Sequence, residues 1–158
     1  GILGAYVIGY FEADIKFDPK LAFFLPLIAA MGGNVGVQSS SIVVQRIANK
    51  SLDLDSTWKK LGKELMIALM IGIAFATLIL TYSFFLSENS LPLTLTVSSA
   101  LFTVILFASL FGTFIPIILN RFSIDPALAT GPFITTTNDI LGMLIYLGIG
   151  RILYGIFL

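Results

Sequence analysis

A single acidic residue lies deep inside an otherwise uncharged stretch of the chain. Asp139 stands near the middle of residues 126–150 and is the one charged residue in them. A carboxylate at the centre of a membrane helix costs about 2.5 to 3.5 kcal/mol and marks an ion pathway by default. Polar or small residues surround it at short helical spacing: Thr135, Thr136, Asn138 and Gly142. We therefore expect Asp139 to bind a cation; a protonated carboxyl hydrogen-bonded within a helix bundle is the alternative.

A second set of polar residues forms a stripe in an earlier apolar stretch. Asn34, Gln38, Ser41 and Gln45 recur at helical spacing and share one face of a helix. In lipid such a face must meet protein or water, because unpaired amides are costly in hydrocarbon. The stripe either hydrogen-bonds neighbouring helices or lines an aqueous path. Its length of about three turns favours the path.

Small residues follow a different face of the same stretch. Gly32, Gly36 and Ser40 recur every four residues. This small-xxx-small pattern lets another membrane helix approach closely. We expect these three residues to serve helix packing.

Two prolines punctuate the last apolar stretch. Asp125 is a favourable N-cap residue, and Pro126 follows it at the first helical position. Pro132 must break the helix, which loosens the backbone carbonyl of Leu128. Irregular backbone at membrane depth lines protein or water, where its carbonyls can serve as ligands for a cation.

The residue types exclude several kinds of chemistry. The chain has no histidine and no cysteine, which excludes zinc and copper sites, thiolate chemistry and histidine acid–base catalysis. Carboxylate, hydroxyl, amide and carbonyl oxygens suit a hard cation. Mg²⁺ fits best, because it is often held through its waters by one or two carboxylates. Since one carboxylate cannot balance a dication, we expect a homodimer that brings two copies of Asp139 together near the twofold axis.

The expected activity is conduction rather than catalysis. The membrane potential by itself drives a divalent cation inward, and no phosphate-binding loop is present, so we expect a channel and not a pump or an enzyme. A proton- or sodium-coupled exchanger that uses Asp139 is the alternative. An intramembrane aspartyl protease would need two carboxylates at one site. A scaffold subunit would use its polar residues only to hold helices together. Mn²⁺, Co²⁺ and Ca²⁺ also accept oxygen ligands.

Long apolar helices must position these residues. Of 158 residues, 57% are hydrophobic and 11% charged, whereas an ordinary soluble domain is about 25% charged. Helices of about 20 apolar residues cross a bilayer, and the uncharged stretches predict an all-α bundle of five membrane spans. We place the spans at about 1–12, 22–47, 64–87, 92–120 and 126–157. We interpret the first as truncated, and residues 1–158 as a single transmembrane domain with no cytosolic regulatory domain.

The few charges predict an orientation. The link between the second and third spans holds five of the nine basic residues: Arg46, Lys50, Lys59, Lys60 and Lys63. Together with Arg121 in a later link, they place both links in the cytoplasm. The N-terminus is then inside and the C-terminus outside. Because nine acidic residues balance the basic ones, the chain has no basic surface for nucleic acid, and membrane lipid is its expected surrounding.

Two segments resemble a known family. Met31 to Gln38, followed by serines, and Asp125 to Gly142 are similar to the second- and fifth-span motifs of the MgtE-type magnesium transporters. The resemblance implies a dimer of five-span subunits in a cell membrane, the inner membrane in bacteria. It implies that Asp139 binds hydrated Mg²⁺. The residues implied to form the nearby wall are Gly33, Asn34, Gly36, Thr135 and Thr136. Bacterial members also carry cytosolic regulatory domains, so this chain corresponds to the membrane domain alone.

Overall fold

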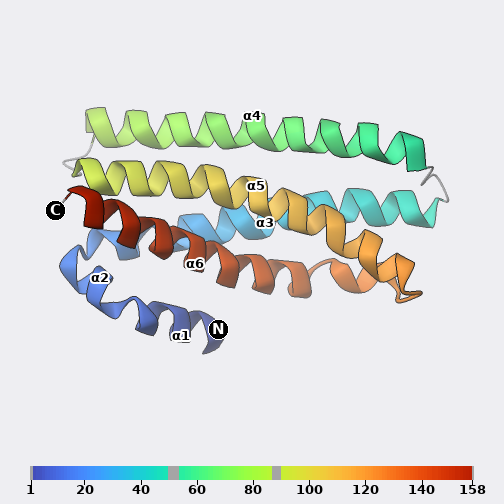
Figure 1. Ribbon diagram of the computed structural model, residues 1–158, viewed down its shortest axis with the longest axis horizontal. Coiled ribbons are helices and arrows are strands. Elements are labelled where there is room, and N and C mark those ends of the chain that lie inside the picture. The colour runs from blue at the N-terminus through green and yellow to red at the C-terminus, as the bar shows by residue number, and fades with distance from the viewer. Residues whose placement is uncertain (1, 50–53, 87–89, 158) are drawn as a thin grey trace.

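The protein is an elongated bundle of helices (Figure 1). The computed structural model describes residues 2–49, 54–86 and 90–157, and the side chains of all of these except 54–61, 86 and 129. The long helices are α3 (Lys20–Ala48), α4 (Leu54–Leu86), α5 (Leu91–Arg121) and α6 (Pro132–Phe157). Shorter ones are α1 (Ile2–Tyr10), α2 (Glu12–Phe17) and the 3₁₀ helix η1 (Pro126–Ala129).

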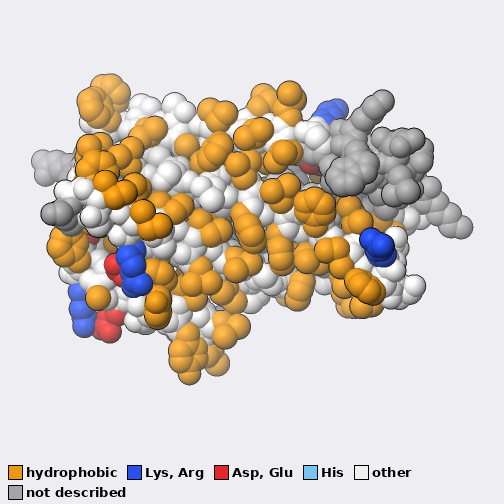
Figure 2. All heavy atoms as spheres, in the orientation of Figure 1, with side chains coloured by type: hydrophobic (Ala, Val, Ile, Leu, Met, Phe, Trp, Pro, Cys, Tyr) orange, Lys and Arg blue, Asp and Glu red, His pale blue; other side chains and the backbone are white. Residues whose placement is uncertain are grey.

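Four helices of the described chain are long and apolar enough to cross a membrane: α3, α5 and α6 along their length, and α4 over Gly62–Phe85. Exposed side chains between the two ends of the bundle are mainly hydrophobic, whereas charged side chains gather near the ends (Figure 2). A surface of this kind suits a lipid environment, since lipid tails are as apolar as the side chains that meet them. The predicted all-α membrane fold is confirmed. The orientation of the ends remains a prediction, and the side chains of Lys50, Lys59 and Lys60 lie outside the described residues.

Helix α5 is the centre of the bundle and packs against α3, α4 and α6. Its inward face is mainly apolar and buried along most of its length, through Leu93, Val97, Leu101, Val104, Ile105 and Ala108. Ser90 begins the helix: its hydroxyl accepts a hydrogen bond of 3.4 Å from the Leu93 amide, and Pro92 follows in the first turn. Such an N-cap satisfies a donor that the helix itself leaves unpaired.

Helices α3 and α5 meet through glycines. A Cβ atom on Gly112 of α5 would overlap the carbonyl oxygen of Gly36 on α3. A Cβ atom on Gly32 would lie 3.0 Å from a methyl group of Val104 on α5. Ser40 is fully buried on the same side of α3. The small-residue stripe predicted from the sequence therefore serves close helix packing.

The last span is divided, as Pro132 predicted. Asp125 accepts a hydrogen bond of 2.9 Å from the Ala127 amide and caps η1, not α6. Gly131 then adopts a φ of 63°, and α6 begins at Pro132. A positive φ costs glycine little, because it has no Cβ atom. The chain thus turns between η1 and α6.

Helices α1 and α2 cover the lower side of α6 (Figure 1). A Cβ atom on Gly4 of α1 would lie 2.9 Å from the terminal methyl group of Met143, so α1 packs tightly on α6. Helix α1 has nine residues, which is less than half of the length that crosses a bilayer. Residues 1–12 alone are therefore too short to cross a membrane, and their membership of a longer first span stays a prediction.

Candidate functional site

Asp139 lies where α6 meets α3. A Cβ atom on Gly33 would be 3.1 Å from Asp139 Oδ1 and 3.1 Å from Cγ2 of Thr135. The carboxylate is half-buried, so one side packs against the α3 backbone while the other remains accessible. Glycine at position 33 leaves the room that this arrangement needs. The structure thus brings together three of the residues predicted for the site.

The two threonines differ in their surroundings. Thr135 is half-buried, and its hydroxyl donates a hydrogen bond of 3.0 Å to the carbonyl of Gly131. Its oxygen therefore stays available as an acceptor or ligand one helical turn from Asp139. Thr136 is exposed on the surface of α6. A hydroxyl here reaches a cation through water more readily than directly, since Mg²⁺ usually keeps several of its waters.

The polar stripe of α3 faces away from the core. Asn34, Gln38 and Gln45 are at least partly exposed, and Ser41 is half-buried. These side chains are therefore not fully buried between helices of the same protomer. The stripe begins with Asn34, which follows Gly33 in the sequence and points about 100° around α3 from the contact with Asp139. Helix α3 thus presents a polar face beside a carboxylate on the outside of the bundle.

Asn138 and Gly142 lie on the inner side of α6. The side chain of Asn138 occupies the space beside Gly36, and the residue is 1% exposed. The space beside Gly142 is filled by Val104 and Ile28, whose methyl groups would be 3.4 and 3.6 Å from a Cβ atom. Neither residue lines the exposed polar face in this conformation. Because Gly142 lies three residues after Asp139, the sequence suggests that it keeps the face of the carboxylate open; in the structure it instead allows α6 to pack closely on its neighbours.

A largely buried carboxylate on α4 was missed by the sequence interpretation. The side chain of Glu64 is only 12% exposed, and its Oε1 atom lies 3.5 Å from Nη2 of Arg46 at the end of α3. Glu64 borders a cavity of about 260 Å³ together with Ser109 and Thr113 of α5. In the sequence, Glu64 stands at the start of an apolar stretch. This position indicated the end of a membrane span, where a glutamate side chain is ordinarily exposed.

One carboxylate per chain serves the candidate site. Within the described part of the chain, no three His, Cys, Asp or Glu side chains come together in a metal-binding group. Asp139 is thus not part of such a group, which suits weak, water-mediated binding of a hard cation better than a closed metal site.

The chain is similar to proteins of a known family. Residues 25–149 match the MgtE family, described as a divalent cation transporter. The chain is 38% identical over 149 residues to the magnesium transporter MgtE of Bacillus subtilis, covering 94% of this chain and 33% of that protein. It is 31% identical over 154 residues to the magnesium transporter MgtE of Thermus thermophilus, covering 97% of this chain and 34% of that protein.

The magnesium transporter MgtE of Enterococcus faecalis is 33% identical over 151 residues, with 94% of this chain and 33% of that protein covered. The chain therefore spans about a third of the length of these relatives. The matched residues include both segments whose motifs resembled the family. With four helices able to cross a membrane among its described residues, the chain is a multi-pass membrane protein that belongs to the MgtE family.

Proposed function

We propose that this chain conducts partly hydrated Mg²⁺ across the membrane, down its electrochemical gradient, through a pore lined by α3 and α6 of a homodimer. The observation that carries the proposal is the position of Asp139 beside Gly33, at the edge of the exposed polar face of α3. The family match and the names of the relatives support a divalent cation, and Mg²⁺ in particular, as the transported ion.

The half-buried position of Asp139 suits an ion that keeps its water. A hydrated Mg²⁺ ion needs a wide site whose walls offer hydrogen-bond acceptors to its waters. Thr135 supplies a neutral oxygen one helical turn from the carboxylate, and Asn34 and Thr136 present exposed oxygens on α3 and α6. A single negative charge attracts the cation without holding it so tightly that it cannot leave, which conduction requires.

A second copy of the chain would complete the pore. One carboxylate balances half of the charge of Mg²⁺, so two copies of Asp139 facing a twofold axis would balance all of it. The polar stripe lies on the outside of the single protomer. Exposing such a polar face to lipid costs free energy. The cost is removed when a partner subunit covers the face and water fills the space between the two subunits. The homodimer therefore follows from charge balance and from the polarity of α3.

The membrane potential supplies the driving force in this proposal. A divalent cation gains about 4.6 kcal/mol per 100 mV on moving inward, twice the value for a unit charge. No coupling ion is then required. A proton- or sodium-coupled exchanger remains the competing function, since an intramembrane aspartate can also bind a coupling ion.

Flux into liposomes distinguishes the two functions. The chain is reconstituted with a Mg²⁺-sensitive dye inside the vesicles, and a potassium diffusion potential is imposed without any proton or sodium gradient. We expect Mg²⁺ entry that increases with the imposed voltage. Entry that strictly requires a counter-gradient would support the exchanger instead.

Substitution of Asp139 then tests the site itself. Asp139→Asn should abolish flux while the dimer, measured by size-exclusion chromatography with light scattering, persists. Glu12→Gln is the matched control, because Glu12 is an exposed carboxylate paired with Lys16 on α2. Unchanged flux in Asp139→Asn would exclude the proposed site.

A further inference from the structure

A cavity of about 370 Å³ lies where α2 and the start of α3 meet the last turns of α6, at one end of the bundle (Figure 1). A volume of this size is within the range of about 300 to 1,000 Å³ that is typical of small-molecule sites. The proposed conduction path does not use it. Most of the residues that line it are small or apolar: Ala13, Phe17, Leu21, Gly150, Tyr154 and Gly155.

Small residues of α2 and α6 leave this space open. Ala13 and Gly155 line the cavity from the two helices, and nothing lies within 4 Å of a Cβ position on Gly155. Leu21 of α3 is 1% exposed and supplies an apolar wall. Phe17 and Gly155 are exposed at the surface, so the cavity is open to the surroundings of the bundle. A lipid chain can therefore enter it from the membrane.

Hydrogen bonds fix the walls of the cavity. The later half of α6 is anchored, because the hydroxyl of Tyr146 donates a hydrogen bond of 2.9 Å to the carbonyl of Leu21. The hydroxyl of Tyr154 donates one of 2.6 Å to Asp18, which holds the tyrosine ring against the cavity. A site whose walls are already ordered binds a ligand at a lower entropic cost.

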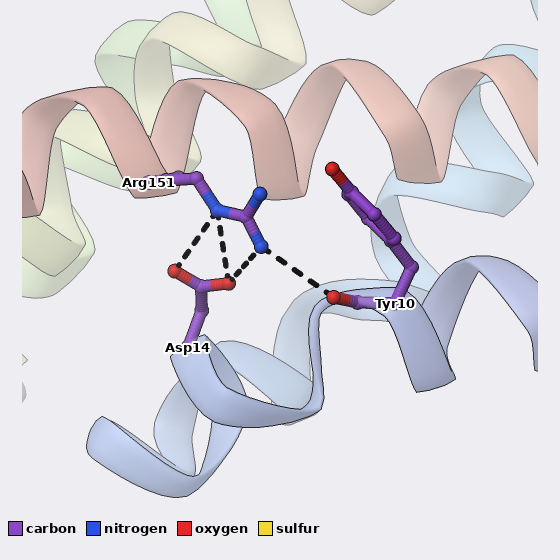
Figure 3. A network of polar contacts seen from close by, with 3 residues as sticks. All are labelled: Tyr10, Asp14 and Arg151. Carbon is purple, nitrogen blue, oxygen red and sulfur yellow. Dashed lines mark hydrogen bonds and ion pairs between the residues drawn. The ribbon is translucent and has the colours of Figure 1, made fainter.

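An ion pair stands at the edge of the cavity. Both Arg151 and Asp14 line it, and Nη2 of Arg151 lies 2.7 Å from Oδ2 of Asp14 (Figure 3). The same nitrogen reaches the carbonyl of Tyr10, and the guanidinium group stacks over the ring of Phe11, with 4.4 Å between Cζ and the ring centroid. The guanidinium group is thus held in one position, while 44% of the arginine side chain stays exposed.

The ion pair can form further hydrogen bonds. The bonds from Arg151 to described residues use Nε and Nη2, which leaves the two N–H groups of Nη1 for another acceptor. A phosphate group is a favoured acceptor for a guanidinium group. A carboxylate has about four acceptor positions, so Asp14 can accept a further bond as well. Because the pair has no net charge, it matches a ligand that carries both a phosphate and an ammonium group.

The surroundings of the cavity are typical of the boundary between lipid tails and headgroups. Charged side chains gather at this end of the bundle (Figure 2), where α2 and the start of α3 hold Glu12, Lys16 and Lys20. Tyr10 and Phe17 are 71% and 63% exposed at the same end. Aromatic side chains are enriched where a membrane meets water. An apolar cavity with an ion pair at its edge, at this depth, has the polarity of a phospholipid.

We propose that the cavity binds one phospholipid whose headgroup carries a primary ammonium group, as in phosphatidylethanolamine. Part of an acyl chain lies against Phe17, Leu21 and Tyr154. The phosphate accepts hydrogen bonds from Nη1 of Arg151, and the ammonium group donates one to Asp14. Since lipid tails are as apolar as the walls, the headgroup determines the selectivity. The bound lipid contacts both α2 and α6. This inference depends on the membrane location of the chain and not on the proposed function.

The first experiment measures retained lipid by native mass spectrometry of the protein in detergent micelles. The chain is titrated with phosphatidylethanolamine and, in parallel, with phosphatidylcholine of the same acyl chains. We expect phosphatidylethanolamine to bind about tenfold more tightly or better, because the choline headgroup has no N–H group to donate to Asp14 and loses a charge-assisted hydrogen bond. Equal binding of the two lipids would overturn the inference.

Gly155→Leu tests the place of binding. The leucine side chain enters the cavity from α6 without overlapping any neighbour at its Cβ position. It should weaken phosphatidylethanolamine binding by about tenfold or more, because a lipid kept out of the cavity cannot bring its phosphate to Arg151. Gly148→Leu is the matched control, since its Cβ position is also open and it does not line the cavity. Equal binding by both variants would overturn the inference. Should Gly155→Leu not fold, Ala13→Leu fills the cavity from α2.

Asp14→Asn tests the recognition of the headgroup. The substitution removes the negative charge of the pair and leaves the site with a net positive charge. We expect the preference to shift from phosphatidylethanolamine to the anionic phosphatidylglycerol, because the anionic headgroup then has no carboxylate to repel it. An unchanged preference would show that the ion pair does not read the headgroup, and would overturn the inference.

A thermal measurement tests whether the bound lipid stabilises the fold at this place. A ligand that binds only the folded state raises its thermal midpoint. Phosphatidylethanolamine should therefore raise the midpoint of the original chain and of Gly148→Leu in detergent, but not that of Gly155→Leu. An equal rise in both variants would mean that the lipid acts elsewhere on the bundle, which contradicts the inference.

Discussion

The carboxylate of Asp139 lies directly against the backbone of Gly33. A Cβ atom at position 33 would come within 3.1 Å of Asp139 Oδ1, closer than ordinary van der Waals contact. The glycine of α3 and the aspartate of α6 are therefore a matched pair, in which the absence of one side chain makes room for the other. This contact determines how far the carboxylate extends toward the polar face of α3.

Gly33→Ala should reduce Mg²⁺ flux without unfolding the protein. The added methyl group displaces the carboxylate and Thr135 by a few tenths of an ångström, because both lie 3.1 Å from its position. Flux into liposomes measures the effect, which we expect to be about tenfold. Gly148→Ala on α6 is the control, since nothing lies within 4 Å of its Cβ position. This control should keep its flux and gain about 0.5 to 1 kcal/mol of stability. Equal flux in both variants would exclude a role for the Gly33 contact.

Gly36→Ala should destabilise the bundle. Its methyl group would overlap the Asn138 amide and touch Ile134, so α3 and α6 must separate or Asn138 must move. Overpacking of this kind costs about 1 to 3 kcal/mol. Thermal unfolding in detergent measures the loss. Gly155→Ala, which has open space around it, is expected to unfold at the original temperature or above it. A Gly36→Ala protein as stable as this control would contradict the close packing of α3 on α6.

Tyr146→Phe should weaken the anchored half of α6. Tyr146 is fully buried, and its hydroxyl donates a hydrogen bond of 2.9 Å to the carbonyl of Leu21. Loss of such a bond costs about 1 kcal/mol, which a chemical denaturation curve detects. Tyr82→Phe on α4 removes an exposed hydroxyl and should leave the curve unchanged. An equally unchanged curve for Tyr146→Phe would mean that the hydrogen bond does not stabilise the fold.

The ion pair between Arg46 and Glu64 should couple α3 to α4. The pair is partly buried, with 30% of the arginine and 12% of the glutamate side chain exposed. A double-mutant cycle with Arg46→Gln and Glu64→Gln should give a coupling energy of about 1 kcal/mol, larger than that of a fully exposed pair. High salt should reduce the coupling only slightly, since the burial limits screening. Additive effects of the two substitutions would show that the pair does not contribute.

Arg151→Gln should loosen α1 and α2. The guanidinium group pairs with Asp14, reaches the carbonyl of Tyr10 and stacks over the ring of Phe11, with 4.4 Å between Cζ and the ring centroid. Without it, backbone amides of residues 2–17 should exchange with deuterium faster, as measured by mass spectrometry. Lys16→Gln breaks only the exposed pair with Glu12 and serves as the control. Unchanged exchange in Arg151→Gln would show that apolar packing alone holds these helices.

Much of the membrane fold was predictable from the sequence, because its signals are local. A run of uncharged residues long enough to cross a bilayer is readable without any knowledge of its neighbours. The break before α6 follows from Pro132, whose ring cannot join a regular helix turn. The small-residue stripe at Gly32, Gly36 and Ser40 likewise indicated a packing face, and that face is where α5 and α6 approach.

The surroundings of individual polar residues were less predictable. Asn138 and Asp139 are adjacent, yet one is fully buried and the other half-exposed. The difference depends on which residues of α3 each one meets, Gly32 and Gly36 for Asn138 and Gly33 for Asp139, and these contacts join residues far apart in the chain. The burial of Glu64 was likewise not predictable, because it depends on the position of Arg46 and on the packing of α4 against α5.

By itself, the sequence determined the helical membrane class, the oxygen-only chemistry and the choice of Asp139 as the candidate ligand, since hydropathy and residue type are properties of each segment alone. Only the tertiary structure decided which face of α6 meets the glycines of α3 and which amide is buried. Helices of similar hydropathy can pack in many rotations. The choice among them comes from close contact at Gly36 and Gly112, where a methyl group would overlap its neighbours, and at Gly33, where it would crowd them.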